Sequence, residues 1–66
     1  MYERLKEEMA KKGTNTHALA LELKISPINL YKSLKGEKPF YPQYRKKIAN
    51  FFNKEEEYLF PGIEEL

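Results

Sequence analysis

Hydrophobic positions along the chain recur with the spacing of α-helices, and polar or glycine-containing segments separate them. Tyr2, Leu5 and Met9, for example, are three and four residues apart, which places them on one face of a helix. Together with capping and breaking residues, this spacing predicts five helices. Their expected ranges are 2–12, 16–23, 27–35, 43–53 and 55–59. The sequence therefore predicts a compact, all-α fold with a single domain spanning residues 1–66.

The second and third of these helices form a pair joined by a tight turn. Leu19 and Leu23 define the apolar face of the first helix of the pair. Ser26 is a favourable N-cap for the second helix, and Pro27 suits its first position, where a backbone N–H has no helical partner. Gly36 is suited to a left-handed turn at the other end. Two short helices in this arrangement are typical of a helix-turn-helix.

The second helix of the pair has a polar face that points away from the core. At 100° per residue, Leu30 and Leu34 point toward the core. The opposite face carries Ile28, Lys32 and Lys35, and Asn29 lies at its edge. A helix that is basic on its free face and braced by another helix is typical of a probe for the DNA major groove. The alternative is a small helical bundle whose lysines are simply solvated.

Charge is distributed unevenly along the chain, although the net charge is only +2. Residues 24–54 contain eight basic side chains and one acidic side chain, whereas residues 55–66 contain five glutamates and no basic residue. We expect a polyanion to be attracted to the middle of the chain and repelled by its end. The alternative is that the lysines only keep a small domain soluble.

The composition argues against several other classes of function. There is no cysteine and only one histidine, His17, so thiolate and multi-histidine metal sites are excluded. The consecutive glutamates from Glu55 to Glu57 point in different directions on a helix and form no metal cage. We therefore expect no metal and no cofactor. No acid–base pair or nucleophile is visible beside His17, so we expect neither an enzyme nor a small-molecule substrate. No apolar run approaches the ~20 residues of a membrane helix.

A series of sequence features follows one another in a characteristic order from Leu5 to Phe60. They are a first helix closed by Gly13, Leu19-Ala20, Leu23, Ile25-Ser26, Leu30, Gly36, a basic loop and the run YRKKIANFFNKEEEYLF. This order resembles the helix-turn-helix domain of phage-repressor and Cro-type transcription regulators, the XRE or lambda-repressor-like family. The resemblance implies a cytoplasmic, bacterial or phage-encoded transcriptional regulator of the repressor type, which acts by occupying a double-stranded DNA operator.

The resemblance, together with the chemistry of the base edges, implies roles for individual residues. We expect base readout from Ile28, Asn29 and Lys32, with Lys32 on guanine and Ile28 on a thymine methyl group. Contacts to phosphates are expected from Thr16, His17, Ser26, Lys35, Lys38 and Tyr41. This chain departs from the family pattern in having Thr16 where glutamine is frequent, Lys24 where the turn usually has glycine, and Ser33 at a position that is often apolar.

Packing expectations concern the second half of the chain. Phe40 is expected to plug the space under the loop rather than to stack on a base. Tyr44, Ile48, Phe51 and Phe52 share a face of the fourth helix and should fill the core. Arg45, Lys46 and Lys47 lie partly off that face, and we expect them to add only long-range attraction to DNA. Leu21 lies away from the Leu19/Leu23 face and is either exposed or packed on the first helix.

We also expect two copies of the chain on DNA, because one short recognition helix contacts only a few base pairs. The acidic segment 55–66 is the expected dimer interface, or seam, with Phe60, Ile63 and Leu66 as dimer contacts. Two other functions remain open. One is a protein-interaction module on the same fold, of the antitoxin or antirepressor type, which the apolar Leu21 and Ile28 favour. The other is RNA binding, which the basic segment permits.

Overall fold

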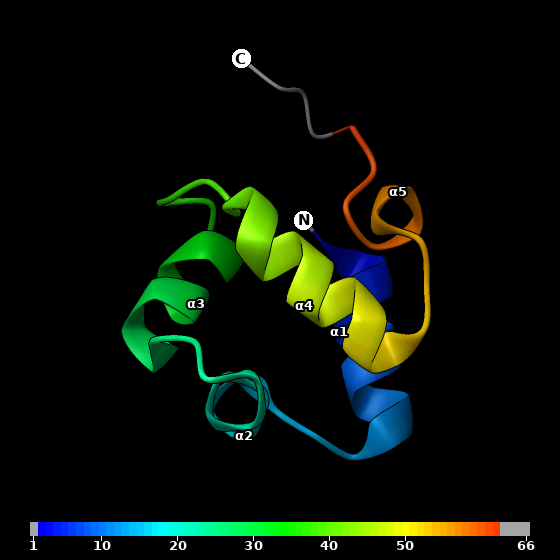
Figure 1. Ribbon diagram of the computed structural model, residues 1–66, viewed down its shortest axis with the longest axis horizontal. Helices are drawn as coiled ribbons and strands as arrows, with labels where there is room; N and C mark the ends of the chain where they lie inside the picture. Colours follow the sequence, from blue (N-terminus) through cyan, green and yellow to red (C-terminus); the bar gives the residue numbers. More distant parts are fainter. Residues whose placement is uncertain (1, 63–66) are drawn as a thin grey trace.

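The computed structural model describes residues 2–62, and within them the chain forms five α-helices and no strand (Figure 1). These helices are α1 (Glu3–Lys12), α2 (Thr16–Leu23), α3 (Pro27–Leu34), α4 (Pro42–Phe52) and α5 (Glu56–Leu59). The predicted all-α fold with five helices is confirmed. Helix α2 packs against α3, and α5 contacts both α1 and α4. None of the helices in the described part of the chain is long and apolar enough to cross a membrane.

The observed helix ends differ from the predicted ones by at most one residue, and backbone geometry explains most of the differences. Helix α1 starts after Tyr2, because Tyr2 itself adopts a left-handed conformation with φ 60°. Gly13 ends α1 in the same left-handed region, as predicted. Helix α4 begins at Pro42, whose ring suits the first helical position, and stops before Asn53, which is left-handed with φ 56°.

The core receives side chains from all five helices and from the two loops beside α3. Its buried members are Leu5, Met9, Leu19, Ala20, Ile25, Leu30, Phe40, Ile48, Ala49, Phe52, Leu59 and Phe60. The prediction for Ile48 and Phe52 is confirmed, whereas Tyr44 and Phe51 lie half-buried at the edge of this core. Leu21 is 61% exposed, which decides between its two predicted positions.

An aromatic cluster joins both ends of the described chain to the loop after α3. The ring of Phe40 lies 4.9 Å from that of Tyr2 and 4.8 Å from that of Phe60, measured between centroids. Phe40 is only 2% exposed, so its predicted role as a plug is confirmed. Phe60 is 3% exposed, and its side chain packs inside the protomer instead of offering surface to a second copy. The other expected dimer contacts, Ile63 and Leu66, lie outside the described residues.

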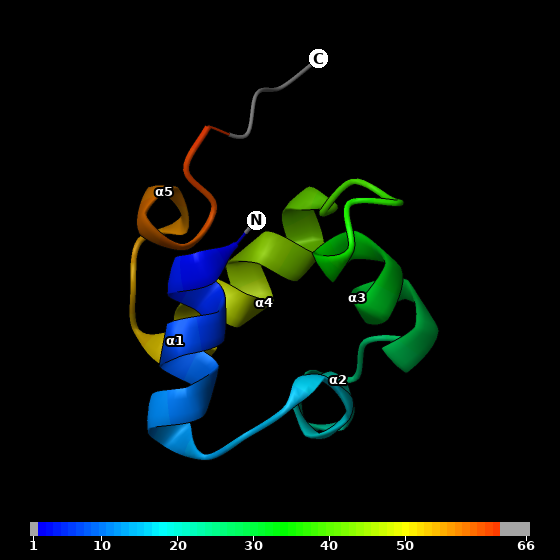
Figure 2. The ribbon, with the colours of Figure 1, turned by 180° about the vertical axis from the view of Figure 1, so that it is seen from behind.

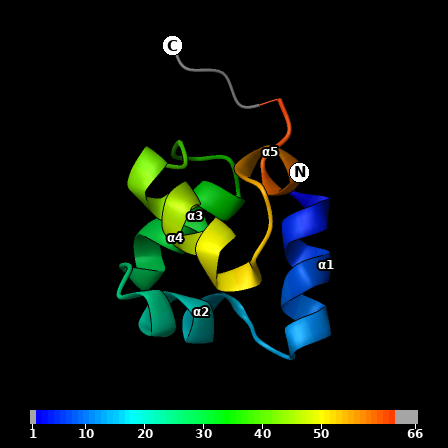
Figure 3. The same cartoon turned by 45° about the vertical axis from the view of Figure 1, so that its right-hand side comes forward.

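Helix α3 and the acidic start of α5 lie at opposite edges of the molecule (Figures 1 and 2). Helix α2 crosses beneath α3, and α1 runs along the side of the molecule that is distant from α3 (Figure 3). The lysines at α3 are thereby separated in space from the described glutamates of the acidic segment, whereas Arg45 of α4 lies beside Glu56. This distance between α3 and the start of α5 reduces the repulsion that the glutamates there exert on an anion near α3.

Candidate nucleic-acid interface

The turn between α2 and α3 contains only three residues, and backbone hydrogen bonds hold it in one conformation. Lys24 takes the left-handed conformation, with φ 59°, at the position where glycine is usual in the XRE pattern. The next residue, Ile25, is buried, and its backbone N–H donates to the carbonyl of Ala20 at 2.9 Å. Ser26 then caps α3, since its Oγ accepts from the backbone N–H of Asn29 at 3.4 Å. These contacts set the angle at which α3 leaves α2.

The outer face of α3 is exposed and carries both apolar and basic side chains. Ile28 is 66% exposed and Tyr31 is 48% exposed, and Lys32 lies beside them on the same surface. The side-chain ammonium groups of Lys32 and Lys35 form no hydrogen bond or ion pair with any described residue, so they are available to an anion. The sequence prediction did not include Tyr31. A position three residues after Ile28 lies on the same helix face, so the helical spacing already contained this signal.

The structure brings three of the predicted DNA contacts, Asn29, Lys38 and Tyr41, together in one polar cluster. The ammonium of Lys38, from the loop after α3, donates to Oδ1 of Asn29 at 3.0 Å. The amide Nδ2 of Asn29 donates to the phenol oxygen of Tyr44 at 3.5 Å. Tyr44 in turn packs edge-to-face against Tyr41, with 5.3 Å between ring centroids. Asn29, Lys38, Tyr41 and Tyr44 thus form one cluster between α3, the loop and the start of α4.

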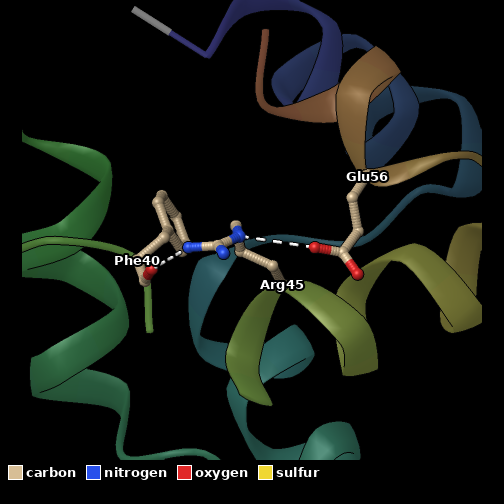
Figure 4. A network of polar contacts seen from close by, with 3 residues as sticks. All are labelled: Phe40, Arg45 and Glu56. Atoms are coloured by element: carbon tan, nitrogen blue, oxygen red, sulfur yellow. Dashed lines mark hydrogen bonds and ion pairs between the residues drawn. The ribbon is translucent and has the colours of Figure 1, made fainter. Parts of the chain in front are cut away.

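Arg45 supports the loop from below, and the prediction that it adds only long-range attraction is wrong. Its side chain lies in the protein, 11% exposed, and its Nη1 donates to the backbone carbonyl of Phe40 at 2.6 Å (Figure 4). Its Nε forms an ion pair with Oε1 of Glu56 at 3.3 Å (Figure 4). A cation that satisfies a buried carbonyl and pairs with a carboxylate is a structural group. Arg45 therefore fixes the loop to α5.

Two further polar contacts position the helix pair and the loop. Ser33 is fully buried, and its Oγ donates to the carbonyl of Pro39 at 3.1 Å. This bond explains how a hydroxyl is accommodated at a position that is often apolar in the XRE pattern. Lys47, predicted to act only at long range, donates from Nζ to the carbonyl of Leu23 at 3.2 Å. It therefore satisfies one of the carbonyls left unpaired at the C-terminal end of α2.

Two other predicted phosphate contacts lie at the start of α2. Thr16 and His17 are the first two residues of α2, where backbone N–H groups have no helical partner. Asn15 precedes them as the N-cap, and its Oδ1 accepts from the backbone N–H of Ala18 at 2.8 Å. His17 is exposed and Thr16 is half-buried. Their contacts to phosphates stay predictions.

The described residues contain no group of three His, Asp or Glu side chains placed to hold a metal ion. The chain matches no family model, no curated protein and no solved structure. Its resemblance to XRE-type domains therefore stays a prediction. The candidate interface is defined by its own geometry, which is a braced and exposed helix α3 with a supported basic loop beside it.

Proposed function

We propose that this chain is a sequence-specific, duplex-DNA-binding transcriptional regulator of the repressor type, which reads the major groove with α3. The observation that carries the proposal is the exposed outer face of α3, with two unpaired lysines, on a helix that α2 holds through a three-residue turn. An α-helix with its side chains is about 10–12 Å across, and the major groove of B-DNA is about 12 Å wide. Helix α3 has the size and the exposure that such an insertion requires.

Each side chain on this face has a chemically suitable target in the major groove. The ammonium of Lys32 can donate to O6 and N7 of guanine, and the side chain of Ile28 can pack against the methyl group of thymine. Lys35 lies at the end of α3, from where a cation can contact the phosphates that line the groove. Repression would follow from occupancy, because a protein bound at an operator excludes polymerase and needs no chemistry of its own.

Electrostatics supports the same orientation. The part of the chain that carries the net positive charge includes α3 and the loop after it, whereas the described glutamates of the acidic segment lie at the opposite edge (Figure 1). A duplex approaching α3 therefore meets lysines at a distance from the described glutamates. This distribution raises the rate of productive encounters with a polyanion.

The proposal is tested by selecting binding sites from random duplex DNA and measuring fluorescence anisotropy on the selected and a shuffled duplex. We expect the selected duplex to bind at least about a thousandfold more tightly, because specific sites are typically preferred by that factor or more. The control is the double variant Lys32→Ala/Lys35→Ala, which removes both unpaired lysines of the α3 face. Equal affinity of the unchanged protein for both duplexes would contradict sequence-specific binding.

A protein-interaction module is the second candidate, and the exposure of Leu21, Ile28 and Tyr31 favours it. Apolar side chains exposed on α2 and α3 are typical anchors for a protein partner. The two candidates differ in the response to salt. Binding to DNA weakens steeply as salt is added, whereas an interface built on apolar anchors depends little on salt. A chain that selects no duplex at low salt would leave this candidate ahead.

A further inference from the structure

The side-chain amide of Asn29 is held in one orientation by its two neighbours. An ammonium group can only donate hydrogen bonds, so the oxygen of the amide, and not its nitrogen, faces Lys38 at 3.0 Å. The nitrogen consequently faces Tyr44, whose phenol oxygen accepts one of its two hydrogens. Both Asn29 and Lys38 are half-buried, and a hydrogen bond with a charged donor is stronger than a neutral one. The orientation is therefore set before any ligand arrives.

This orientation changes what Asn29 can recognise. A free asparagine reads adenine by accepting from N6 with its oxygen while it donates to N7 with its nitrogen. Here the oxygen already accepts from Lys38, and an adenine amino group at that oxygen would place its N–H groups beside the ammonium. The hydrogens still available on the pair are one on Nδ2 of Asn29 and two on Nζ of Lys38. The pair therefore presents donors and disfavours a base that also donates.

We propose that Asn29 and Lys38 act as one reading unit that recognises guanine and rejects adenine at a single base pair. The proposal rests on the proposed DNA-binding function and adds the base that the cluster selects. Guanine presents two acceptors, O6 and N7, in the major groove, and these match the donors of the pair. Lys38 acts twice in this unit: it contacts guanine, and it positions the amide of Asn29. Tyr44 contributes only by holding Nδ2, because its ring is half-buried against Tyr41.

The test compares the unchanged protein with Lys38→Met, which keeps most of the length of the side chain and removes all its donors. The base pair concerned is located first, as the position at which Asn29→Ala loses its preference in selected duplexes. Anisotropy is then measured on duplexes that differ only at this base pair. We expect the unchanged protein to prefer guanine over adenine at least about fivefold, the lower range for one specific base contact. In Lys38→Met the oxygen of Asn29 is released, and we expect the preference to move toward adenine.

The matched control is Lys46→Met, which removes an exposed lysine from α4 that makes no contact with Asn29. It lowers the positive charge by the same amount and should leave the preference for guanine unchanged. A second measurement needs no DNA: the side-chain amide resonances of Asn29, recorded by NMR in the free protein. We expect these resonances to shift in Lys38→Met and to stay in place in Lys46→Met. Thermal unfolding of both variants checks that each is folded.

The outcomes separate the reading unit from the proposed function. If Lys38→Met weakens binding to all duplexes equally and keeps the guanine preference, Lys38 is only a phosphate contact and the reading unit is wrong. The reading unit would also be wrong if the unchanged protein preferred adenine at this base pair, or if the amide resonances of Asn29 did not shift in Lys38→Met. In these cases sequence-specific binding survives. A protein that distinguishes no duplex at any position overturns both proposals.

Discussion

The guanidinium of Arg45 donates from Nη1 to the backbone carbonyl of Phe40 at 2.6 Å, beneath the loop that follows α3. Phe40 is itself buried against the rings of Tyr2 and Phe60, so the loop is held to the core by this backbone bond as well as by the Phe40 side chain. The loop also carries Lys38, which holds the amide of Asn29. The position of the candidate reading residues therefore depends on a buried cation behind them.

Replacing Arg45 by methionine should lower the free energy of unfolding by about 2 kcal/mol. The substitution leaves the carbonyl of Phe40 without its charged donor, and hydrogen bonds to charged groups contribute about 1.5–3 kcal/mol. Urea denaturation measures the effect. The control is Lys46→Met, which replaces the exposed neighbouring residue and should change the free energy of unfolding by at most about 0.5 kcal/mol. Glu56→Gln should cost less than about 1 kcal/mol, because the carboxylate is partly exposed. Equal effects of Arg45→Met and Lys46→Met would show that the buried contact is unimportant.

Replacing Lys24 by glycine should stabilise the protein. Lys24 has a φ of 59°, and the left-handed conformation costs an L-residue about 1–2 kcal/mol, part of which is offset by the greater flexibility of glycine in the unfolded chain. We expect Lys24→Gly to unfold with a free energy about 0.5–1 kcal/mol higher than that of Lys24→Ala, which removes the same charge but keeps a Cβ. Chemical denaturation of the two variants measures the difference. A Lys24→Gly variant that is less stable than Lys24→Ala would contradict strain in this turn.

Affinity for duplex DNA should fall steeply with salt concentration. Each phosphate contact contributes about −0.9 to the slope of log K against log salt, so a protomer with about four contacts should give a slope near −4. Anisotropy titrations between low and physiological salt measure this slope on a shuffled duplex. A flat response would argue against phosphate contacts and would favour the protein-interaction module.

Lys32 and Lys35 should differ in how they affect different sequences. Lys32→Ala should cost about 1–3 kcal/mol on the selected site and relax the preference at one base pair, because it removes a base contact. Lys35→Ala should weaken all duplexes to a similar extent and make the salt slope shallower by about one unit. Affinities of both variants for a set of single-base-pair substitutions measure the contrast. If both lysines affect every sequence alike, Lys32 does not read a base.

Two protomers should bind to one palindromic site, although we expect the free protein to be mainly monomeric at micromolar concentration. Half-sites about 34 Å apart place two α3 helices in successive turns of the major groove. Sedimentation with and without a selected palindrome measures the stoichiometry. Phe60 is buried in the protomer, so Ile63→Ser is the variant that tests the expected seam without opening the core. A one-to-one complex on the palindrome would contradict the dimer.

The sequence by itself determined the five helices and most of the core, because the signals for them are local. Apolar residues three and four positions apart identify a helix face, and Ser26, Pro27 and Gly13 mark helix ends through the conformations of their own backbones. The uneven charge was also visible in the sequence. These features need only the few neighbouring residues along the chain, so helix ends were predicted to within one residue.

Only the tertiary structure decided which polar groups meet. Arg45 pairs with Glu56 eleven residues away, Asn29 contacts Tyr44 fifteen residues away, and Lys47 reaches the carbonyl of Leu23 across twenty-four residues. Helical periodicity cannot relate such positions, because it describes the face of one helix and not how two helices pack. The negative charge of segment 55–66, which DNA would repel, led to the prediction that Phe60 lies in an interface between two copies. The packing of three aromatic rings from distant segments makes Phe60 part of the core instead.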